Sequence, residues 1–83
     1  MHIAYNDVAG PGDGLQVRLP KILVALGLAA SGAEANRKIG EKAVKLDGST
    51  AANAVVTIDA LPARIVVRLG KRAKAAVIEA VGE

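Results

Sequence analysis

The sequence predicts a small α+β domain, because two stretches with helical spacing come first and several short stretches with strand alternation follow. With 83 residues, of which 52% are hydrophobic, the chain is long enough for one domain with its own core. The hydrophobic residues are almost all aliphatic, with no Phe or Trp and a single tyrosine, Tyr5. We therefore expect one thin, aliphatic core and no large enclosed pocket.

The first segment, residues 1–16, is expected to form a flexible linker or arm. It contains the run from Gly10 to Gly14, which has high backbone freedom and nothing apolar to bury. This run is not expected to bind a nucleotide, because no GK[ST] triplet closes it and no apolar strand precedes it. The folded domain is expected to occupy residues 17–83.

A first helix is predicted from about Pro20 to Leu26. Four apolar residues have the i, i+3, i+4, i+7 spacing that places them on one helical face: Leu19, Ile22, Leu23 and Leu26. Pro20 suits the first turn, where its missing N–H would have no helical partner. Gly27 provides a C-terminal stop.

A second helix is predicted to begin at Ser31. Ser31 and Glu34 have the SxxE spacing of a capping box, in which hydroxyl and carboxylate each pair with a free backbone N–H. The cap explains Ser31 without catalysis, since no histidine is available to activate its hydroxyl. This helix should bury Ala35 and Ile39 and end near residues 40–42. Its exposed side should carry Asn36, Arg37 and Lys38.

The next segments alternate with the period of two that is typical of strands. Val44–Leu46 is predicted to be the first strand, with Lys45 pointing away from its apolar neighbours. Asp47 and Gly48 then provide a turn able to adopt positive φ. Val55–Ile58 is predicted to be the second strand.

The third strand is predicted at Ile65–Leu69, where apolar residues alternate with Arg64 and Arg68. This alternation places two cations on the face opposite the buried one. A turn follows at residues 70–72. The last apolar segment, Ala75–Ile78, returns either as a fourth strand or as a short helix, since its alanines suit both.

No constellation of catalytic or metal-binding residues is found in the sequence. There is no cysteine, and the single histidine, His2, has no second metal ligand near it. Asp47 and Asp59 are interpreted as solvated carboxylates of a turn and a strand end. The chain by itself is therefore predicted to be non-catalytic and to hold no cofactor.

The positive charge is predicted to gather at the start of the first helix, on the second helix and at the final turn. The formal net charge of +3 favours an anionic partner. The candidate RNA-binding residues are Arg18, Lys21, Arg37, Lys38, Lys71, Arg72 and Lys74. If these elements pack together, their cations converge on a face suited to a phosphate backbone. Ordinary solvated surface charges are the alternative interpretation.

The longest apolar stretch, Ile22 to Ala30, is interrupted by Gly27 and is shorter than the ~20 residues that span a membrane. No basic segment followed by an apolar run and a cleavage site opens the chain. We therefore expect a cytoplasmic protein with no membrane partner.

Several short motifs follow one another between Val17 and Ser49. The residues that carry them are Arg18, Leu19, Gly27, Leu28, Ala29, Ser31, Glu34, Ala35, Arg37, Ile39, Val44, Asp47 and Gly48. In this order they resemble the RNA-binding domain named after ribosomal small-subunit protein four, called the S-four domain below. The later stretch VVRLGKR, Val66 to Arg72, is similar to the closing hairpin of this domain at the C-terminus of bacterial tyrosyl-tRNA synthetases.

The resemblance implies a two-helix hairpin packed on a small, curved antiparallel sheet, with the second helix and the hairpin tip contacting tyrosine-specific transfer RNA. It also implies a homodimeric parent enzyme, a tyrosine-tRNA ligase, with its ATP and tyrosine sites in a preceding catalytic domain. Neither signature of that domain, HIGH or KMSKS, occurs here. The chain would then be the tRNA-docking appendage, monomeric when isolated and without a cofactor of its own.

The chain departs from the family pattern at several positions. Asn36 stands where the first of two arginines is usual, and Lys42 stands where a glycine is usual, which requires a left-handed residue or a shifted loop. Ala73 and Ala76 replace basic residues, and Lys74 replaces an aromatic one. Two other functions remain open: a free-standing S-four protein acting on ribosomal RNA, and a protein-interaction module that uses the aliphatic sheet face.

Overall fold

The computed structural model describes residues 2–10, 12 and 14–80, and it confirms the α+β class. The elements, in chain order, are β1 (His2–Ala4), α1 (Tyr5–Val8), β2 (Gln16–Arg18), α2 (Leu19–Ala25), α3 (Gly32–Gly40), β3 (Val44–Leu46), β4 (Ser49–Thr50), β5 (Val55–Thr57), β6 (Ala63–Leu69) and β7 (Arg72–Glu79).

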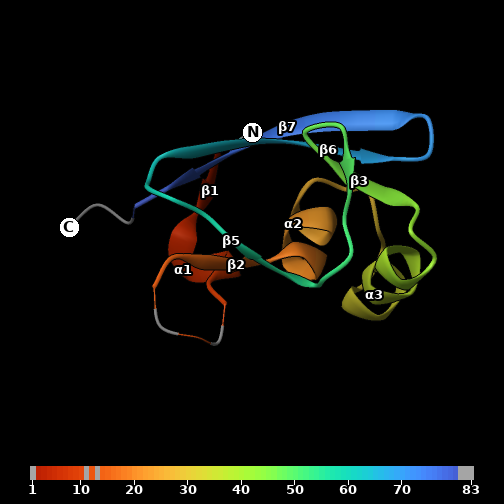
Figure 1. Cartoon of the computed structure of the whole chain (residues 1–83), viewed down its shortest axis with the longest axis horizontal. Coiled ribbons are helices and arrows are strands. Elements are labelled where there is room, and N and C mark those ends of the chain that lie inside the picture. Colours follow the sequence, from red (N-terminus) through yellow and green to blue (C-terminus); the bar gives the residue numbers. More distant parts are fainter. Residues whose placement is uncertain (1, 11, 13, 81–83) are drawn as a thin grey trace.

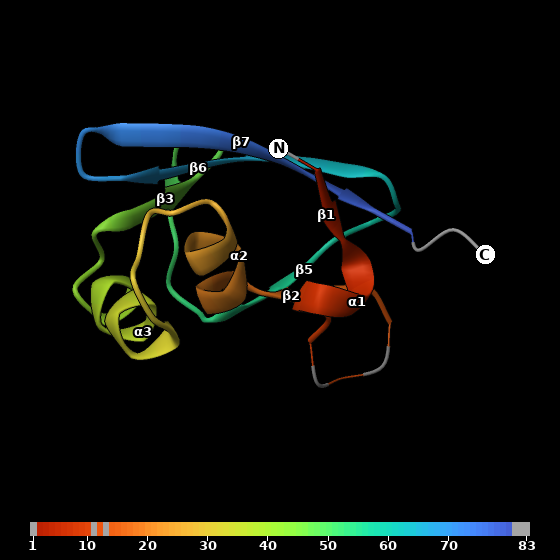
Figure 2. The same cartoon turned by 180° about the vertical axis from the view of Figure 1, so that it is seen from behind.

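Five of the strands form one sheet, in the order β1-β7-β6-β3-β4, and the helices lie on one side of it (Figures 1 and 2). The pairs β7-β6, β6-β3 and β3-β4 are antiparallel, as expected, whereas β1 is parallel to β7. Strands β2 and β5 form a separate antiparallel ribbon. The sheet is therefore mixed, and no helix in the described part of the chain covers its other face, which we call the uncovered face.

Helix α2 follows the predicted pattern, starting one residue before Pro20 and ending at its C-cap, Leu26. Gly27 then adopts a φ of 75°, the left-handed conformation in which a glycine avoids the steric cost of a Cβ. Helix and stop are thus where the local sequence predicts them.

Helix α3 begins after its predicted cap, with the Ser31 hydroxyl accepting a hydrogen bond from the N–H of Glu34 at 3.2 Å. The reciprocal half of the capping box differs in detail, because the Glu34 carboxylate accepts from the N–H of Ala30 at 3.4 Å instead of from Ser31. After the helix, Lys42 has a φ of 61°. Lys42 therefore adopts the left-handed conformation at the position where the S-four pattern usually has a glycine.

The Asp47-Gly48 turn joins β3 to β4, with φ values of 49° and 89°. The Asp47 carboxylate accepts the N–H of Val66 at 3.0 Å, and the Asp47 N–H donates to the Val66 carbonyl at 2.9 Å. Asp47 is thus more than a solvated turn residue, because it extends the contact between β3 and β6.

The later strands agree with the sequence in position but not always in partner. The segment predicted at Val55–Ile58 forms β5, which pairs with β2 instead of joining the main sheet. Ala75–Ile78, for which the sequence allows either a strand or a short helix, lies within strand β7. This strand pairs along the length of β6.

The first segment differs from the expected arm. Ile3 and Val8 are buried, with exposed fractions of 6% and 1%, and β1 extends the sheet beside β7. The Tyr5 hydroxyl accepts from the N–H of Gln16 at 3.2 Å and donates to the Gly14 carbonyl at 3.3 Å. The expected boundary between residues 16 and 17 is therefore wrong for the described residues. Met1, Pro11, Asp13 and residues 81–83 lie outside them.

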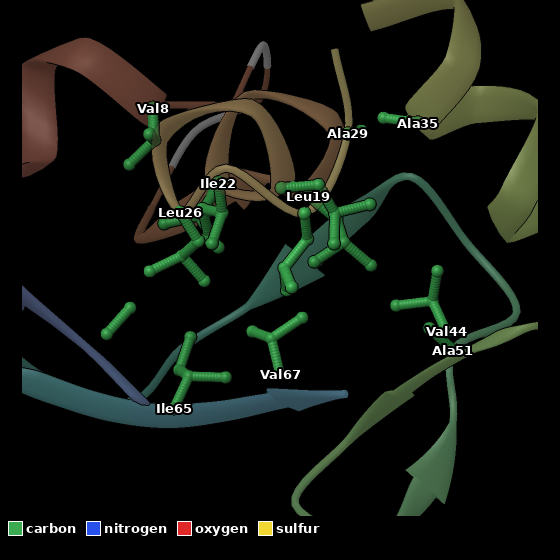
Figure 3. Close-up of a cluster of buried hydrophobic side chains, with 14 of the residues drawn as sticks. Val8, Leu19, Ile22, Leu26, Ala29, Ala35, Val44, Ala51, Ile65 and Val67 are labelled. Atoms are coloured by element: carbon green, nitrogen blue, oxygen red, sulfur yellow. The ribbon is translucent and has the colours of Figure 1, made fainter. Parts of the chain in front are cut away.

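The core lies between α2 and the main sheet and is aliphatic, as predicted. The largest fully buried side chains are Val8, Val17, Leu19, Ile22, Leu23, Val44, Val67 and Ile78. Figure 3 shows Leu19 and Ile22 of α2 on the side of the helix that faces Val67 of β6. No polar or charged side chain is buried among the described residues. None of the helices in this part of the chain has the length and apolar character needed to cross a membrane.

Candidate nucleic-acid interface

The first pair of predicted site residues lies at the start of α2. Arg18 is the N-cap residue and Lys21 is in the first turn, and both are exposed. Together with Asn36 of α3 they line a hollow of about 380 Å³, which the other lining residues complete: Pro20, Gly32, Ala54 and Val55. The structure therefore places Arg18 and Lys21 around the same hollow as Asn36, the residue that stands where the S-four pattern usually has an arginine.

The second pair lies in the C-terminal half of α3. Arg37 is exposed and Lys38 is half-buried, with its Nζ 3.9 Å from a carboxylate oxygen of Glu41. Both residues also belong to the last turn of the helix, where a cation interacts favourably with the helix dipole. In the described part of the chain, Arg37 forms no ion pair.

The third group surrounds the β6–β7 turn. Lys71 is exposed at the turn, while the guanidinium of Arg72 donates to the Gly27 carbonyl at 3.1 Å. The ammonium of Lys74 donates to the Leu26 carbonyl at 2.7 Å. Arg72 and Lys74 thus satisfy carbonyls at the C-terminal end of α2 and fasten the hairpin to that helix.

The expectation of a single convergent face is met only in part. Figures 1 and 2 show α3 and the β6–β7 turn at the same end of the molecule's long axis, which brings the second and third groups to one end. Arg18 and Lys21 lie at the opposite end of α2 from Arg72 and Lys74. A seven-residue helix separates those groups by roughly 10 Å.

Lys42 is a further cation at this end, although the sequence motifs indicate only that it replaces a glycine. It is exposed immediately after α3, and it forms no ion pair among the described residues. In the sequence, its spacing of four residues from Lys38 indicates that the two cations lie close together. We define the end patch as Arg37, Lys38, Lys42 and Lys71.

The remaining cations of the main sheet lie on its uncovered face. Lys45 of β3 is directly opposite Arg68 of β6, and Arg64 is further along β6. The Arg68 Nε donates to the Gly70 carbonyl at 3.0 Å. Because the helices cover the other face, these three residues are separate from the end patch.

Two other polar residues considered in the sequence, His2 and Tyr5, have structural partners. His2 pairs with Glu79 across β1 and β7, and Tyr5 holds the loop before β2. The described residues include no group of three or more histidine, cysteine or carboxylate side chains placed to hold a metal ion.

No protein-family model matches the chain, and no curated protein matches it. The resemblance to the S-four domain therefore depends on the sequence motifs given above.

Proposed function

We propose that this chain is an RNA-binding module that docks transfer RNA, as the C-terminal part of a tyrosyl-tRNA synthetase. The observation that carries the proposal is the end patch, where α3 and the β6–β7 turn present exposed cations at one end of the molecule (Figure 1). Arg and Lys side chains bind phosphates by releasing counterions, and they need no deep pocket to do so. The motif resemblance supports the choice of transfer RNA.

The hairpin is held in a way that suits such a role. Arg72 and Lys74 are bonded to the end of α2, so the turn that carries Lys71 is fixed relative to the helices. A preformed set of cations loses less conformational entropy on binding than a mobile one. Phosphate contacts position an RNA without reading its sequence, so the module would supply affinity and orientation.

In the proposed parent enzyme, a preceding domain would bind ATP and tyrosine, and the protein would act in the cytoplasm. A free-standing S-four protein that binds ribosomal RNA would use the same end patch. Transfer RNA and a ribosomal RNA fragment, compared in one assay, separate these two clients.

The protein-interaction alternative is favoured by one observation, the exposure of Val66, at 40%, on the uncovered sheet face. Lys45 and Arg68 are paired directly across strands on that face, and two copies placed face to face would bring these like charges together. We therefore expect no self-association through this face, and sedimentation at rising protein concentration measures it.

The main test is the affinity for transfer RNA as a function of salt. If Arg37, Lys42 and Lys71 each meet a phosphate, the plot of log affinity against log salt should fall with a slope of roughly 2 to 3. Reversing two of these charges, in the double variant Arg37→Glu with Lys71→Glu, should weaken binding at least ~10-fold and flatten the slope by about two contacts. Fluorescence anisotropy with labelled transfer RNA gives both quantities.

The matched control is Lys45→Glu with Arg64→Glu, which changes the net charge equally on the uncovered face. This variant should lose much less affinity and keep the slope. If it loses as much as the end-patch variant, only net charge matters and the proposed interface is wrong. Tighter binding of ribosomal RNA than of transfer RNA would move the function to the free-standing alternative.

A further inference from the structure

The hollow at the start of α2 has the size and lining of a small-ligand site. Its volume of about 380 Å³ lies within the ~300–1,000 Å³ typical of such sites. It adjoins a second hollow of about 350 Å³, and the two share Pro20, Lys21 and Gly32. The two hollows together form a groove between the first turns of α2 and α3.

The two hollows differ in charge. The first contains Arg18 and Lys21 and no acidic residue, whereas the second contains Asp7 beside Lys21. Neither cation of the first hollow forms an ion pair among the described residues. An anionic group is therefore stabilised more strongly in the first hollow than in the second, where Asp7 opposes the charge of Lys21.

The rest of the first hollow complements the other parts of a nucleotide. Pro20, Ala54 and Val55 provide an apolar wall, and each of them is partly buried. Asn36 is exposed on α3, and its carboxamide offers both a donor and an acceptor at the rim. Asparagine pairs with adenine in a bidentate manner, through the base's N6 and N7.

We propose that the first hollow binds one nucleoside phosphate, with adenine as the preferred base, supplied by an unpaired nucleotide of the RNA. Arg18 and Lys21 hold the phosphate, the apolar wall covers the base, and Asn36 reads its edge. This inference rests on the proposed RNA binding. It adds a base preference that phosphate contacts alone do not give.

The walls of the hollow are held by backbone hydrogen bonds. The Leu19 N–H donates to the Ala54 carbonyl at 2.7 Å, and Arg18 is paired with Val55 in the β2–β5 ribbon. Asn36 is placed by α3, whose first turn is capped by Ser31. The site is therefore formed before a ligand arrives, which favours binding of a flexible, unpaired nucleotide.

The first experiment compares two RNA hairpins that differ only by one bulged adenosine. The bulged RNA should bind about 10-fold more tightly, in line with the discrimination of a bidentate base contact. Gly32→Leu should abolish this difference, because position 32 lines both hollows and a Cβ there meets no atom within 4 Å. The larger side chain therefore fills the groove without disturbing the core.

Gly40→Leu is the matched control. Gly40 is the last residue of α3, a Cβ there also meets no atom within 4 Å, and it lines neither hollow. This variant should keep the preference for the bulged RNA. A replacement of the bulged adenosine by uridine should lower the affinity to that of the fully paired hairpin.

A second experiment uses adenosine monophosphate alone, followed by NMR through the side-chain amide of Asn36 and the backbone amide of Val55. Shifts that disappear in Gly32→Leu assign the site to a nucleoside phosphate, and the bulged RNA then shows whether RNA supplies it. Equal affinity for the paired and bulged RNAs, with no shift from the mononucleotide, overturns this site while RNA binding stands. Shifts from the mononucleotide with no RNA binding retain the site and overturn the proposed RNA function.

Discussion

At the scale of single residues, the clearest contributions come from positions where one side chain or one dihedral angle completes a local structure. The Ser31 hydroxyl pairs with the first turn of α3, and Asp47 pairs with the backbone of β6. Lys42 occupies a conformation that costs an L-residue free energy. Ser31 and Asp47 lie outside the end patch, so their effect on stability can be measured without changing the proposed RNA contacts. Lys42 belongs to the end patch, so its effects on stability and on RNA affinity are measured together.

Ser31→Ala should lower the free energy of unfolding by about 1 kcal/mol, because the Glu34 N–H loses its partner. Denaturant melts measure the change. Ser49→Ala is the control, since Ser49 is exposed in β4 and its side chain makes no hydrogen bond to the described residues. An unchanged midpoint and slope for Ser31→Ala would show that the cap contributes nothing.

Lys42→Gly should have opposite effects on stability and binding. Removing the Cβ at a φ of 61° relieves a cost of about 1–2 kcal/mol, partly offset by the greater entropy of glycine in the unfolded chain, so stability should rise by up to ~1 kcal/mol. The slope of log RNA affinity against log salt should become shallower by one contact. Thermal melts and salt titrations give the two results, and a less stable variant would contradict the assigned strain.

At the scale of elements, the β6–β7 hairpin and α2 are held together by side chains that the sequence predicted as RNA ligands. Arg72 and Lys74 donate to carbonyls at the end of α2, which lack partners within the helix. Their remaining N–H groups are free to meet solvent or phosphate. Arg72 and Lys74 therefore have a structural role at the hairpin, whereas Lys71, exposed at the turn, is assigned only to the proposed contact with RNA.

Lys74→Met keeps the length of the side chain and removes its hydrogen bond to the Leu26 carbonyl. We expect a loss of about 1 kcal/mol in stability and faster amide exchange in β6 and β7. Lys71→Met, at the turn, should change stability by less than ~0.5 kcal/mol. If both variants exchange at the same rate as the unmodified chain, the contact between hairpin and helix is not stabilising.

At the scale of the whole molecule, the N-terminal segment is part of the folded domain, because it contributes a strand to the sheet and buried side chains to the core. Strand β1 adds a parallel strand beside β7, and Val8 of α1 enters the core next to α2. Figure 1 shows β1 and α1 beside the end of the sheet that lies away from α3. This segment therefore stabilises the domain at a distance from the end patch.

Ile3→Ala should lower the stability of the domain by about 2 kcal/mol, because it removes buried apolar surface between β1 and the rest of the core. Asn6→Ala is the control, since Asn6 is exposed on α1. Denaturant melts measure both, and backbone relaxation by NMR should show residues 2–10 as rigid as α2. Affinity of the folded protein for RNA should stay unchanged, as neither position is near the end patch.

The sequence by itself determined the local structure and the class of fold. Gly27 and the Asp47-Gly48 turn define their elements through local backbone dihedral angles, and Ser31 does so through its contact with Glu34. A sequence pattern records such local features directly. The burial of Leu19, Ile22 and Leu23 follows from helical spacing alone.

Only the tertiary structure decided the pairings between distant segments. Ile3 of β1 pairs with Ile78 of β7, and β5 pairs with β2 instead of the main sheet. The residues of β1 and β5 alone do not predict these partners. The same holds for the cations, because nothing in the sequence distinguishes Arg18 from Arg37 or Lys71. The packing of α2, α3 and the hairpin places Arg18 in the groove and the other two in the end patch. Such choices depend on which distant surfaces bury the most apolar area together, and that free energy belongs to the whole fold.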